Sequence, residues 1–442
     1  SQEVMADLMT GTRSFKGKLP VSNNFYPVNH GISIDKKNIL GYSRPVYEGF
    51  DQKKLSYLDS IAISAIDSMM APGIQMLVSK KGKIVYNKSF GYHTYKKLNK
   101  LENDHVFDLS SITKILATMP LVIQEYESGN LSLNTRLNQL FPKKTLADKG
   151  EITLKEMLSH YARLRPWIPF YEETLNRKEK PKTRLYKTSS RSSFSTPVTE
   201  NLFLKKNYKQ KIFKSIVESE LIEKLEFKYS DLPFYFLKFW FEDIYSKPLD
   251  LLAHERIFSK LQLERTMFNP YKKLSLDEIV PSEEDDFFRY SKLHGYVHDE
   301  GAAMLGGVSG HAGLFSNSYE VAVILQAMIQ GGSYNSQRLF NPESFDVFNT
   351  CYYCEYDNRS GVGFDKPQIE GNHGSTFGGV SMNSFGHYGY TGSMAWADPD
   401  EEIIFVFLSN RTFPTRENTL LQKSNIRTRS QEIVYKSIID SK

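Results

Sequence analysis

A serine and a lysine three residues apart, Ser111 and Lys114, have the types and the spacing for nucleophilic chemistry. On a helix, side chains three positions apart share a face and can touch. A serine hydroxyl is a weak nucleophile until a neighbouring base removes its proton. A lysine amine is such a base only when neutral, and lowering a lysine pKa from about 10.4 to about 7 takes about 4–5 kcal/mol. We therefore expect Lys114 to be buried against Ser111.

The same spacing occurs at Ser33 and Lys36, and an isolated match of this kind more often joins two surface side chains. The context of Ser111 is different, because it follows the apolar Val106 and Phe107 and opens a predicted helix. The free N–H groups at a helix N-terminus can stabilise an oxyanion. Ser111 is therefore the favoured nucleophile.

Periodic apolar residues predict a helix and a hairpin before Ser111. The helix begins at Asp51, its N-cap, and ends before Pro72-Gly73. Its apolar face consists of Leu55, Leu58, Ala62, Ala65 and Met69. The β-rich runs 74–78 and 84–90 are joined by a turn that contains a glycine, which predicts a hairpin.

Helices dominate after Ser111, and strands return near the C-terminus. Helices are expected at 111–119, followed by a kink at Pro120 and an end at Ser128-Gly129, and at 152–158, 319–329 and 418–439. Strands are expected at 389–397 and 403–408, on either side of a turn at 398–400.

These elements predict an α/β (α+β) fold, in which one antiparallel sheet is built from both chain ends, flanked by helices, with a mostly helical region inserted. We expect an N-terminal extension at 1–45 and one domain at 46–442. In that domain, residues 46–110 and 370–442 form the sheet region, and residues 111–369 form the helical region.

The composition is that of a soluble globular protein, with 442 residues, 40% apolar and 24% charged. The net charge of +5 is too small and too dispersed to indicate nucleic-acid binding. No apolar run approaches the roughly 18 residues of a membrane span. The segment 177–191 is crowded with Lys, Arg, Ser and Thr, so we expect an exposed loop, with attraction of an anionic wall polymer as the alternative.

The chain has two cysteines, Cys351 and Cys354. One C-x-x-C pair cannot complete a four-ligand zinc site. The pair is either a local disulfide or two free thiols, and we favour no functional role. No metal or organic cofactor is expected.

The segment Asp108 to Lys114 resembles the nucleophile motif of class C β-lactamases and of related esterases, D-peptidases and penicillin-binding proteins. Other segments resemble further motifs of the same family, in the same order along the chain. They are residues 128–133, residues 152–160, Tyr229-Ser230-Asp231 at the position of the family's Tyr-x-Asn, residues 305–314, and His387-Tyr388-Gly389 at the position of Lys-Thr-Gly or His-x-Gly. The resemblance runs from about Asp51 to the C-terminus.

The resemblance implies a role for each matching residue. Ser111 would attack an acyl carbonyl, and Lys114 and Tyr229 would share the general-base and general-acid work. Tyr229 suits this role if lysine and backbone dipoles lower its pKa, or if it relays protons from Lys114. The backbone amides of Ser111 and Tyr390 would form the oxyanion hole. The substrate would be bound by Asp231, His387 and Gly389.

Each of these assignments has an alternative in the sequence. Tyr229 could simply pack in the core. A strict Tyr-x-Asn occurs at Tyr356-Asp357-Asn358, but it comes too late in the order of motifs. A second His-x-Gly begins at His311, and we prefer His387 because strands and a closing helix follow it. His160 and His311 are expected to be structural.

Three departures from the family pattern affect the expected activity. Asp231 replaces Asn. An ionised carboxylate cannot donate a hydrogen bond to a substrate amide, as the amide group of Asn does. If Asp231 pairs with Lys114, it would also raise the pKa of that lysine. His387 replaces Lys, which weakens binding of a β-lactam carboxylate near neutral pH. Arg163 stands where the family usually has Gly, so the shape of that loop is open. The first two favour an esterase or peptidase over an efficient β-lactamase.

Residues 8–22 resemble the closing segment of family-three glycoside hydrolases, of which some bacterial β-N-acetylhexosaminidases carry a C-terminal β-lactamase-like domain. This resemblance implies an upstream glycoside hydrolase domain in cis and an extracytoplasmic (periplasmic or secreted) setting. The expected function is a serine acyl hydrolase that forms an acyl-enzyme on an ester or amide, with a cell-wall D-amino-acid peptide as a plausible substrate. The alternative is a catalytically silent wall-binding module that serves the attached glycosidase.

Overall fold

The computed structural model describes residues 2–368 and 374–439. At its centre is a six-stranded sheet of order β1-β3-β2-β16-β15-β14. Its strands are β1 (Gly41–Tyr42), β2 (Gly73–Lys80), β3 (Lys83–Gly91), β14 (Phe385–Tyr388), β15 (Met394–Asp398) and β16 (Ile403–Ser409). The two chain ends meet where β2 pairs antiparallel with β16. This confirms the predicted fold class, except that β1 pairs parallel with β3 and comes from within the expected extension.

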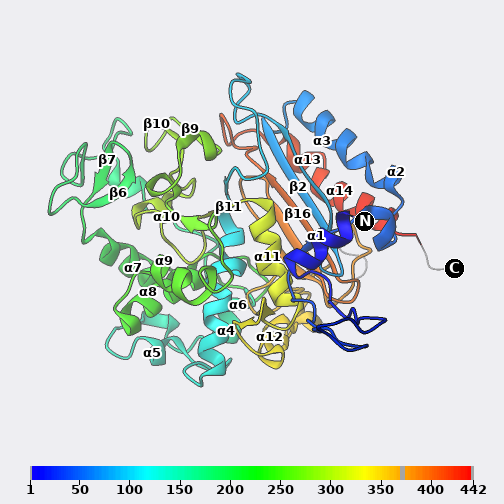
Figure 1. Cartoon of the computed structure of the whole chain (residues 1–442). Helices are drawn as coiled ribbons and strands as arrows, with labels where there is room; N and C mark the ends of the chain where they lie inside the picture. The colour runs from blue at the N-terminus through cyan, green and yellow to red at the C-terminus, as the bar shows by residue number, and fades with distance from the viewer. Residues whose placement is uncertain (1, 369–373, 440–442) are drawn as a thin grey trace.

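Both faces of the sheet are buried, which explains the continuous apolar run of β16. Phe405 and Phe407 pack into the core on the side of α3 (Tyr57–Asp67) and α14 (Ile426–Lys436). Ile404 and Val406 belong to the larger core on the other side, with α11 (Ser318–Ile329). Successive strand side chains point to opposite faces, so a strand covered on both sides is apolar throughout. Figure 1 shows the sheet between these two layers.

The helix expected from Asp51 is divided into α2 (Gln52–Leu55) and α3 at Ser56. The Asp51 carboxylate caps α2, accepting from the backbone N–H groups of Lys53 and Lys54 at 2.9 and 3.1 Å. Met69 is 55% exposed and has a left-handed backbone (φ +54°). Its expected place on the apolar face is wrong, because the chain has already turned away from the helix there.

The segment that begins at Ser111 is not one regular α-helix. A 3-10 turn (Ser110–Ile112) leads into a π-helical turn (Lys114–Thr118) and then into α4 (Met119–Glu127). Pro120 lies in the first turn of α4, directly after the π-helical turn, which ends with the Met119 N–H donating to the Lys114 carbonyl. The change of helix type therefore takes the place of the expected proline kink.

Helices make up most of the regular secondary structure of the inserted region (Figure 1). Besides α4, it contains α5 (Leu137–Leu140), α6 (Leu154–Leu158), α7 (Tyr208–Glu218), α8 (Leu232–Tyr245), α9 (Leu249–Ala253), α10 (Glu300–Met304), α11 and α12 (Pro342–Asn349). It also holds a small sheet of order β4-β11-β8, formed by β4 (Phe107–Asp108), β11 (Leu314–Ser316) and β8 (Met267–Phe268). This small sheet leads directly into Ser111.

The strand expected at 389–397 begins too early. Residues 389–393 form the turn between β14 and β15, with the Gly389 N–H donating to the Ser393 carbonyl at 2.9 Å. The terminal helix is divided into α13 (Leu420–Lys423) and α14. Residues 369–373 and 440–442, which belong to the predicted helical and sheet regions, lie outside the described residues.

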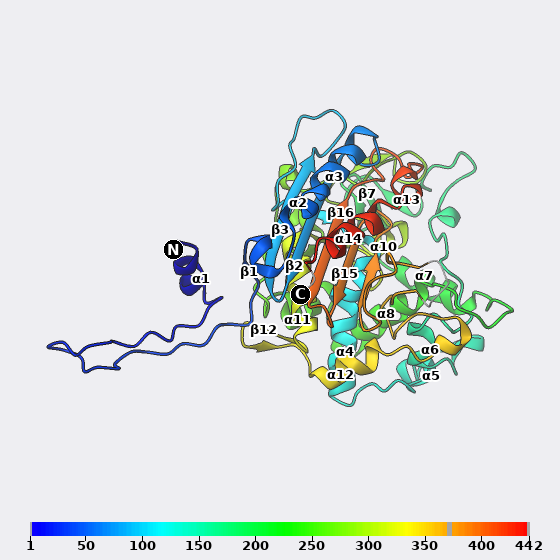
Figure 2. The same cartoon turned by 90° about the vertical axis from the view of Figure 1, so that its right-hand side faces the viewer.

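Much of the N-terminal segment projects from this body, although Asp7 pairs with Lys83 at 3.3 Å and Leu40 is buried in the core. Helix α1 (Gln2–Thr10) is followed by an extended excursion that projects away from the sheet in Figure 2. Ser33 and Lys36, the alternative serine–lysine pair, are both exposed there. Among the helices of residues 2–368 and 374–439, none combines the length and the apolar character that a membrane span requires.

The basic segment 177–191 is mostly exposed, but it is tethered to the body. Tyr186 is buried, and the strand β5 (Tyr186–Lys187) pairs with β7 (Leu202–Leu204). Cys351 and Cys354 form a disulfide, the first of the two alternatives that the sequence left open.

Candidate active site

Three side chains from distant parts of the chain meet in one place. The Lys114 amine nitrogen Nζ lies 2.8 Å from Ser111 Oγ and 2.7 Å from Tyr229 Oη. The Tyr229 hydroxyl donates to Ser111 Oγ at 3.0 Å. The predicted nucleophile therefore has a lysine and a tyrosine within hydrogen-bond reach, the geometry that activation of a serine requires.

Ser111 follows a sharp turn in which Ser110 has a left-handed backbone (φ +49°). That conformation is unfavourable for any residue with a Cβ, so it needs support from its surroundings. The buried Asp108 supplies this support: its carboxylate accepts from the N–H of Ser110 at 2.8 Å and from the N–H of His298 at 2.6 Å. Asp108 lies just before the serine–lysine motif, but no local sequence pattern indicates this supporting role.

The segment that carries Tyr229 is fixed at two points. His160 Nδ1 accepts from the Ser230 N–H at 3.2 Å, and its ring lies 4.7 Å from that of Tyr229. The Asp231 N–H donates to the Pro166 carbonyl at 2.9 Å. His160, expected as a structural residue, therefore packs directly against Tyr229 and holds its neighbour.

The environment of Lys114 acts on the pKa of its amine in two opposite directions. The side chain has no exposed surface, and this burial lowers the pKa of its amine. Asp231 acts in the opposite direction, because its Oδ1 lies 2.7 Å from Lys114 Nζ and stabilises the ammonium. The pairing that the sequence raised as a difficulty is thus present, yet the balance still lowers the pKa of Lys114.

Tyr229 stays protonated at neutral pH. Burial raises the pKa of its hydroxyl well above the ordinary value of 10, and the negative charge of Asp231 raises it further. The first condition considered for this residue, a phenol made acidic by its neighbours, is therefore not met. The second remains, in which the neutral hydroxyl passes a proton between Ser111, Lys114 and a leaving group.

His387 lies on β14, the edge strand of the sheet. Burial, and after it the charge of Lys114, lowers the pKa of this imidazole to about 4, so it is neutral near pH 7. Its Nδ1 lies 2.7 Å from the Tyr388 carbonyl, which can only accept, so Nδ1 carries the proton and Nε2 presents a lone pair. This histidine can accept a hydrogen bond from a substrate, but it brings no positive charge to a carboxylate.

The end of β14 lies directly against the nucleophile turn. The Tyr390 N–H donates to Ser110 Oγ at 3.2 Å. A Cβ added to Gly389 would lie 2.6 Å from the Leu109 carbonyl oxygen, closer than real side chains approach. The close approach therefore requires glycine at 389, and it places the Tyr390 amide beside the turn that carries Ser111.

Ser111, Tyr229 and His387 line a cavity of about 720 Å³. Its walls also carry charged side chains that the sequence did not indicate. Arg359 pairs with Asp365 at 3.2 Å, and Arg427 lies 4.1 Å from the Tyr388 ring centre. Arg359 directly follows the second Tyr-x-Asn, whose Asn358 is buried and donates to the Ser159 carbonyl at 2.8 Å. That motif therefore positions an arginine rather than a catalytic tyrosine.

His311 is buried behind the site, as expected. Its Nε2 lies 2.9 Å from an Asp299 carboxylate oxygen, its Nδ1 lies 2.9 Å from Ser309 Oγ, and its carbonyl faces Lys114 Nζ at 3.4 Å. Within residues 2–368 and 374–439, no three His, Cys, Asp or Glu side chains are grouped as metal ligands.

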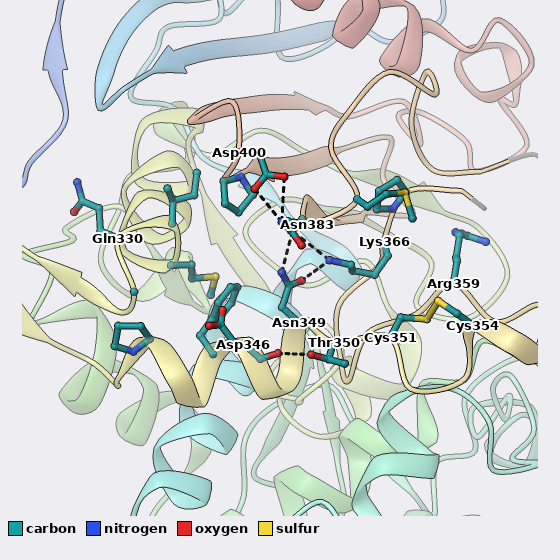
Figure 3. Close-up of a pocket in the computed structure, with 18 residues that line it drawn as sticks. Gln330, Asp346, Asn349, Thr350, Cys351, Cys354, Arg359, Lys366, Asn383 and Asp400 are labelled. Carbon is teal, nitrogen blue, oxygen red and sulfur yellow. Dashed lines mark hydrogen bonds between the residues drawn. A yellow bond between two sulfur atoms is a disulfide. The ribbon is translucent and has the colours of Figure 1, made fainter. Parts of the chain in front are cut away.

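A second cavity, of about 780 Å³, shares Arg359 with the first. Figure 3 shows Lys366 reaching Asn349 and Asn383 there, at 2.8 Å from the Asn349 side-chain oxygen and 3.2 Å from the Asn383 carbonyl. Burial lowers the pKa of Lys366 to about 8. Among the described residues that line this cavity, none holds a hydroxyl against the Lys366 amine in the way that Ser111 is held against Lys114, so the candidate active site is the first cavity.

Known proteins resemble this chain over most of its length. Residues 62–425 match the family model described as Beta-lactamase. A protein of Escherichia coli K12 named "Putative D-alanyl-D-alanine carboxypeptidase" is 29% identical over 422 residues, covering 87% of this chain and 88% of that protein. A protein of the same name from Salmonella agona is 30% identical over 399 residues, covering 84% of this chain and 86% of that protein.

Solved structures share the fold at low sequence identity. A penicillin-binding protein homologue from Caulobacter crescentus superposes with a TM-score of 0.62 at 17% identity, covering 88% of this chain and 99% of that one. EstCE1, described as a hydrolase with promiscuous acyltransferase activity, gives a TM-score of 0.59 at 17% identity over 86% of this chain and 100% of that one. The chain belongs to the beta-lactamase family and is a serine acyl hydrolase.

Proposed function

We propose that Ser111 is the nucleophile of a two-step acyl transfer to water. Ser111 Oγ attacks the substrate carbonyl while neutral Lys114 takes its proton, and the leaving group departs with a proton relayed through Tyr229. Water then hydrolyses the resulting ester. The amides of Ser111 and Tyr390 stabilise the oxyanion in both steps. The observation that carries this proposal is the contact of one fully buried amine with both hydroxyls.

The substrate that we propose is a cell-wall peptide that ends in a D-amino acid. The names of the Escherichia coli and Salmonella relatives support this class. His387 is neutral and brings no positive charge to the C-terminal carboxylate of such a peptide, but Arg359, Arg416 and Arg427 line the same cavity. Such a substrate implies an extracytoplasmic site of action. The comparisons lend no support to a catalytically silent binding module, and the upstream glycoside hydrolase domain remains a prediction.

Labelling with mechanism-based probes tests the nucleophile. The protein is treated with a fluorescent penicillin and with a fluorophosphonate, and its intact mass is measured. We expect one covalent adduct in the wild type and none in Ser111→Ala. An adduct that persists in Ser111→Ala would place the nucleophile elsewhere, and a wild type that reacts with neither probe would contradict the proposal. Turnover of D-Ala-D-Ala peptides against p-nitrophenyl esters then identifies the substrate class.

Asp231→Asn is expected to extend activity to lower pH. Asp231 stabilises the ammonium form of Lys114, so its neutralisation lets the pKa of Lys114 fall further. Because the neutral amine is the base, the acidic limb of the profile of kcat/KM against pH moves to lower pH. Glu300→Gln is the matched control: Glu300 lines the same cavity but pairs with Arg416. A limb that stays in place or moves to higher pH in Asp231→Asn contradicts the assignment of Lys114 as base.

Gly389→Ala is expected to reduce acylation by about 10²–10³-fold, the usual effect of losing one oxyanion donor. The new methyl group meets the Leu109 carbonyl oxygen, so the Tyr390 amide must move away from Ser111. Gly150→Ala is the control, because a Cβ there meets Asn138 at an ordinary 3.5 Å. The acylation rate constant and the melting temperature are measured for both. Wild-type acylation by Gly389→Ala would show that this close approach has no part in the reaction.

A further inference from the structure

One tryptophan is placed unlike the other two. Trp240 and Trp396 are buried, with exposed fractions of 5% and 1%, whereas Trp167 is 56% exposed. Trp167 lines the cavity that contains Ser111, and it also lines a neighbouring groove of about 460 Å³. A large apolar ring left in water forgoes the stabilisation of burial. Trp167 lies where the cavity of Ser111 meets the groove, so a ligand that covers the ring would recover this stabilisation.

The backbone around Trp167 is rigid and tied to the active site. Pro166 directly precedes Trp167, and Pro169 follows two residues after it, so the two proline rings restrict the backbone on both sides of the indole. The Pro166 carbonyl accepts from the Asp231 N–H at 2.9 Å, and the Arg165 carbonyl accepts from Ser230 Oγ at 2.6 Å. The segment that carries the indole is thus bonded to the residues that follow Tyr229.

The groove beyond Trp167 has a polar rim. Arg165 and Glu220 form an exposed ion pair at 3.2 Å, and Glu223 lies on the same groove. The backbone of Arg163 is left-handed (φ +58°), the conformation that the family's glycine favours. Its side chain is bonded to a residue of the groove, because its Nε donates to the Ile222 carbonyl at 2.6 Å. The loop whose shape the sequence left open is thereby bonded to the groove wall.

A flat apolar ring beside charged hydrogen-bonding groups fits one ligand chemistry best. A pyranose presents an apolar face of C–H groups and an edge of hydroxyl groups. An apolar amino-acid side chain would gain nothing from Arg165 and Glu220, whereas sugar hydroxyl groups can accept from the first and donate to the second. Aromatic side chains of this amphipathic kind typically mark recognition surfaces.

We propose that Trp167 and the groove beside it form a saccharide subsite, so that the preferred substrate is a wall peptide still joined to its sugar. This inference rests on the proposed function for the reaction itself. The sugar lies over the indole in the groove, and the peptide runs from there into the cavity with its scissile carbonyl at Ser111. Trp167 then acts in binding and orientation, and it takes no part in proton transfer.

Binding without turnover is tested first, with the Ser111→Ala protein and a chitin-derived N-acetylglucosamine trimer as the probe. Tryptophan emission should change saturably, because Trp167 is solvated while Trp240 and Trp396 are buried. The change should disappear in the Ser111→Ala protein that also carries Trp167→Phe, and calorimetry should show weaker binding there. No saturable binding of the trimer, or an equal response to free lysine, would overturn the proposal.

Kinetics give the second test. The readout is kcat/KM for a disaccharide–pentapeptide divided by that for the free pentapeptide, so a general effect on the chemistry cancels. We expect a ratio of about ten in the wild type, as one good aromatic contact supplies, and a ratio near one in Trp167→Ala. Tyr57→Ala, which removes another exposed aromatic ring from α3, should keep the wild-type ratio. A wild-type ratio of one contradicts the subsite even if Ser111 is acylated normally, so the two proposals fail separately.

Discussion

Lys114→Ala is expected to lower the rate constant for acylation of Ser111 by about 10³–10⁴-fold. In the wild type, the Lys114 amine is the only nitrogen side chain that the described structure places within hydrogen-bond distance of Ser111 Oγ, at 2.8 Å. Its replacement leaves the serine with the Tyr229 hydroxyl, which its raised pKa keeps protonated, so that it cannot take the proton of the serine. The measurement is the rate of adduct formation with a fluorescent penicillin, followed by intact mass.

The loss of a buried amine has a structural cost as well, and Lys238→Ala controls for it. Lys238 is 3% exposed and pairs with Glu242 on α8, and it does not line the cavity of Ser111. Both variants should have lower melting temperatures, but only Lys114→Ala should lose acylation. Equal acylation by the two variants, or wild-type kinetics in Lys114→Ala, would remove Lys114 from the mechanism.

The parts of the site that the sequence could predict are those fixed by local geometry. Ser111 and Lys114 are one helical turn apart, and any helical conformation between 3-10 and π brings such side chains together. Tyr229, His387 and Tyr390 were found because the order of family motifs places them. The sheet followed from apolar runs long enough to be buried on both faces.

The parts that the sequence could not predict depend on contacts between distant segments. Asp108 supports the nucleophile turn through the N–H of His298, 190 residues later. Arg359 reaches the cavity because the buried Asn358 bonds to the carbonyl of Ser159. Hydrogen bonds of this kind leave no periodic pattern along the chain, so neither residue could be identified in advance.

The electrostatics of the site likewise depend on burial. From the sequence, two opposite effects on Lys114 were open: burial, which lowers its pKa, and Asp231, which raises it. The pKa of Lys114 is lowered overall because the fold buries the amine completely, and this position could not be deduced from the sequence. For Tyr229 the same burial has the opposite consequence, because it disfavours the charged phenolate.

Tyr229→Phe is expected to reduce acylation by about 10²–10³-fold for amide substrates. The variant deletes the hydroxyl that lies 2.7 Å from Lys114 Nζ and 3.0 Å from Ser111 Oγ, and with it the path by which a proton reaches the leaving group. Lys114 keeps its own contact with Ser111, so deprotonation of the serine should continue. The measurement is kcat/KM for a D-Ala-D-Ala peptide and for a p-nitrophenyl ester of the same acyl group.

The two substrates separate a proton relay from a structural role. A p-nitrophenolate leaves without being protonated, whereas an amine leaving group must receive a proton before the C–N bond breaks. Loss of the Tyr229 hydroxyl should therefore slow the peptide much more than the ester. Tyr186→Phe, which deletes a buried hydroxyl 2.8 Å from Thr174 Oγ1 and outside the cavity, should slow neither. Equal losses for ester and peptide in Tyr229→Phe would mean that the tyrosine only holds Lys114 and Ser111 in place, and the protonation step would then require another donor.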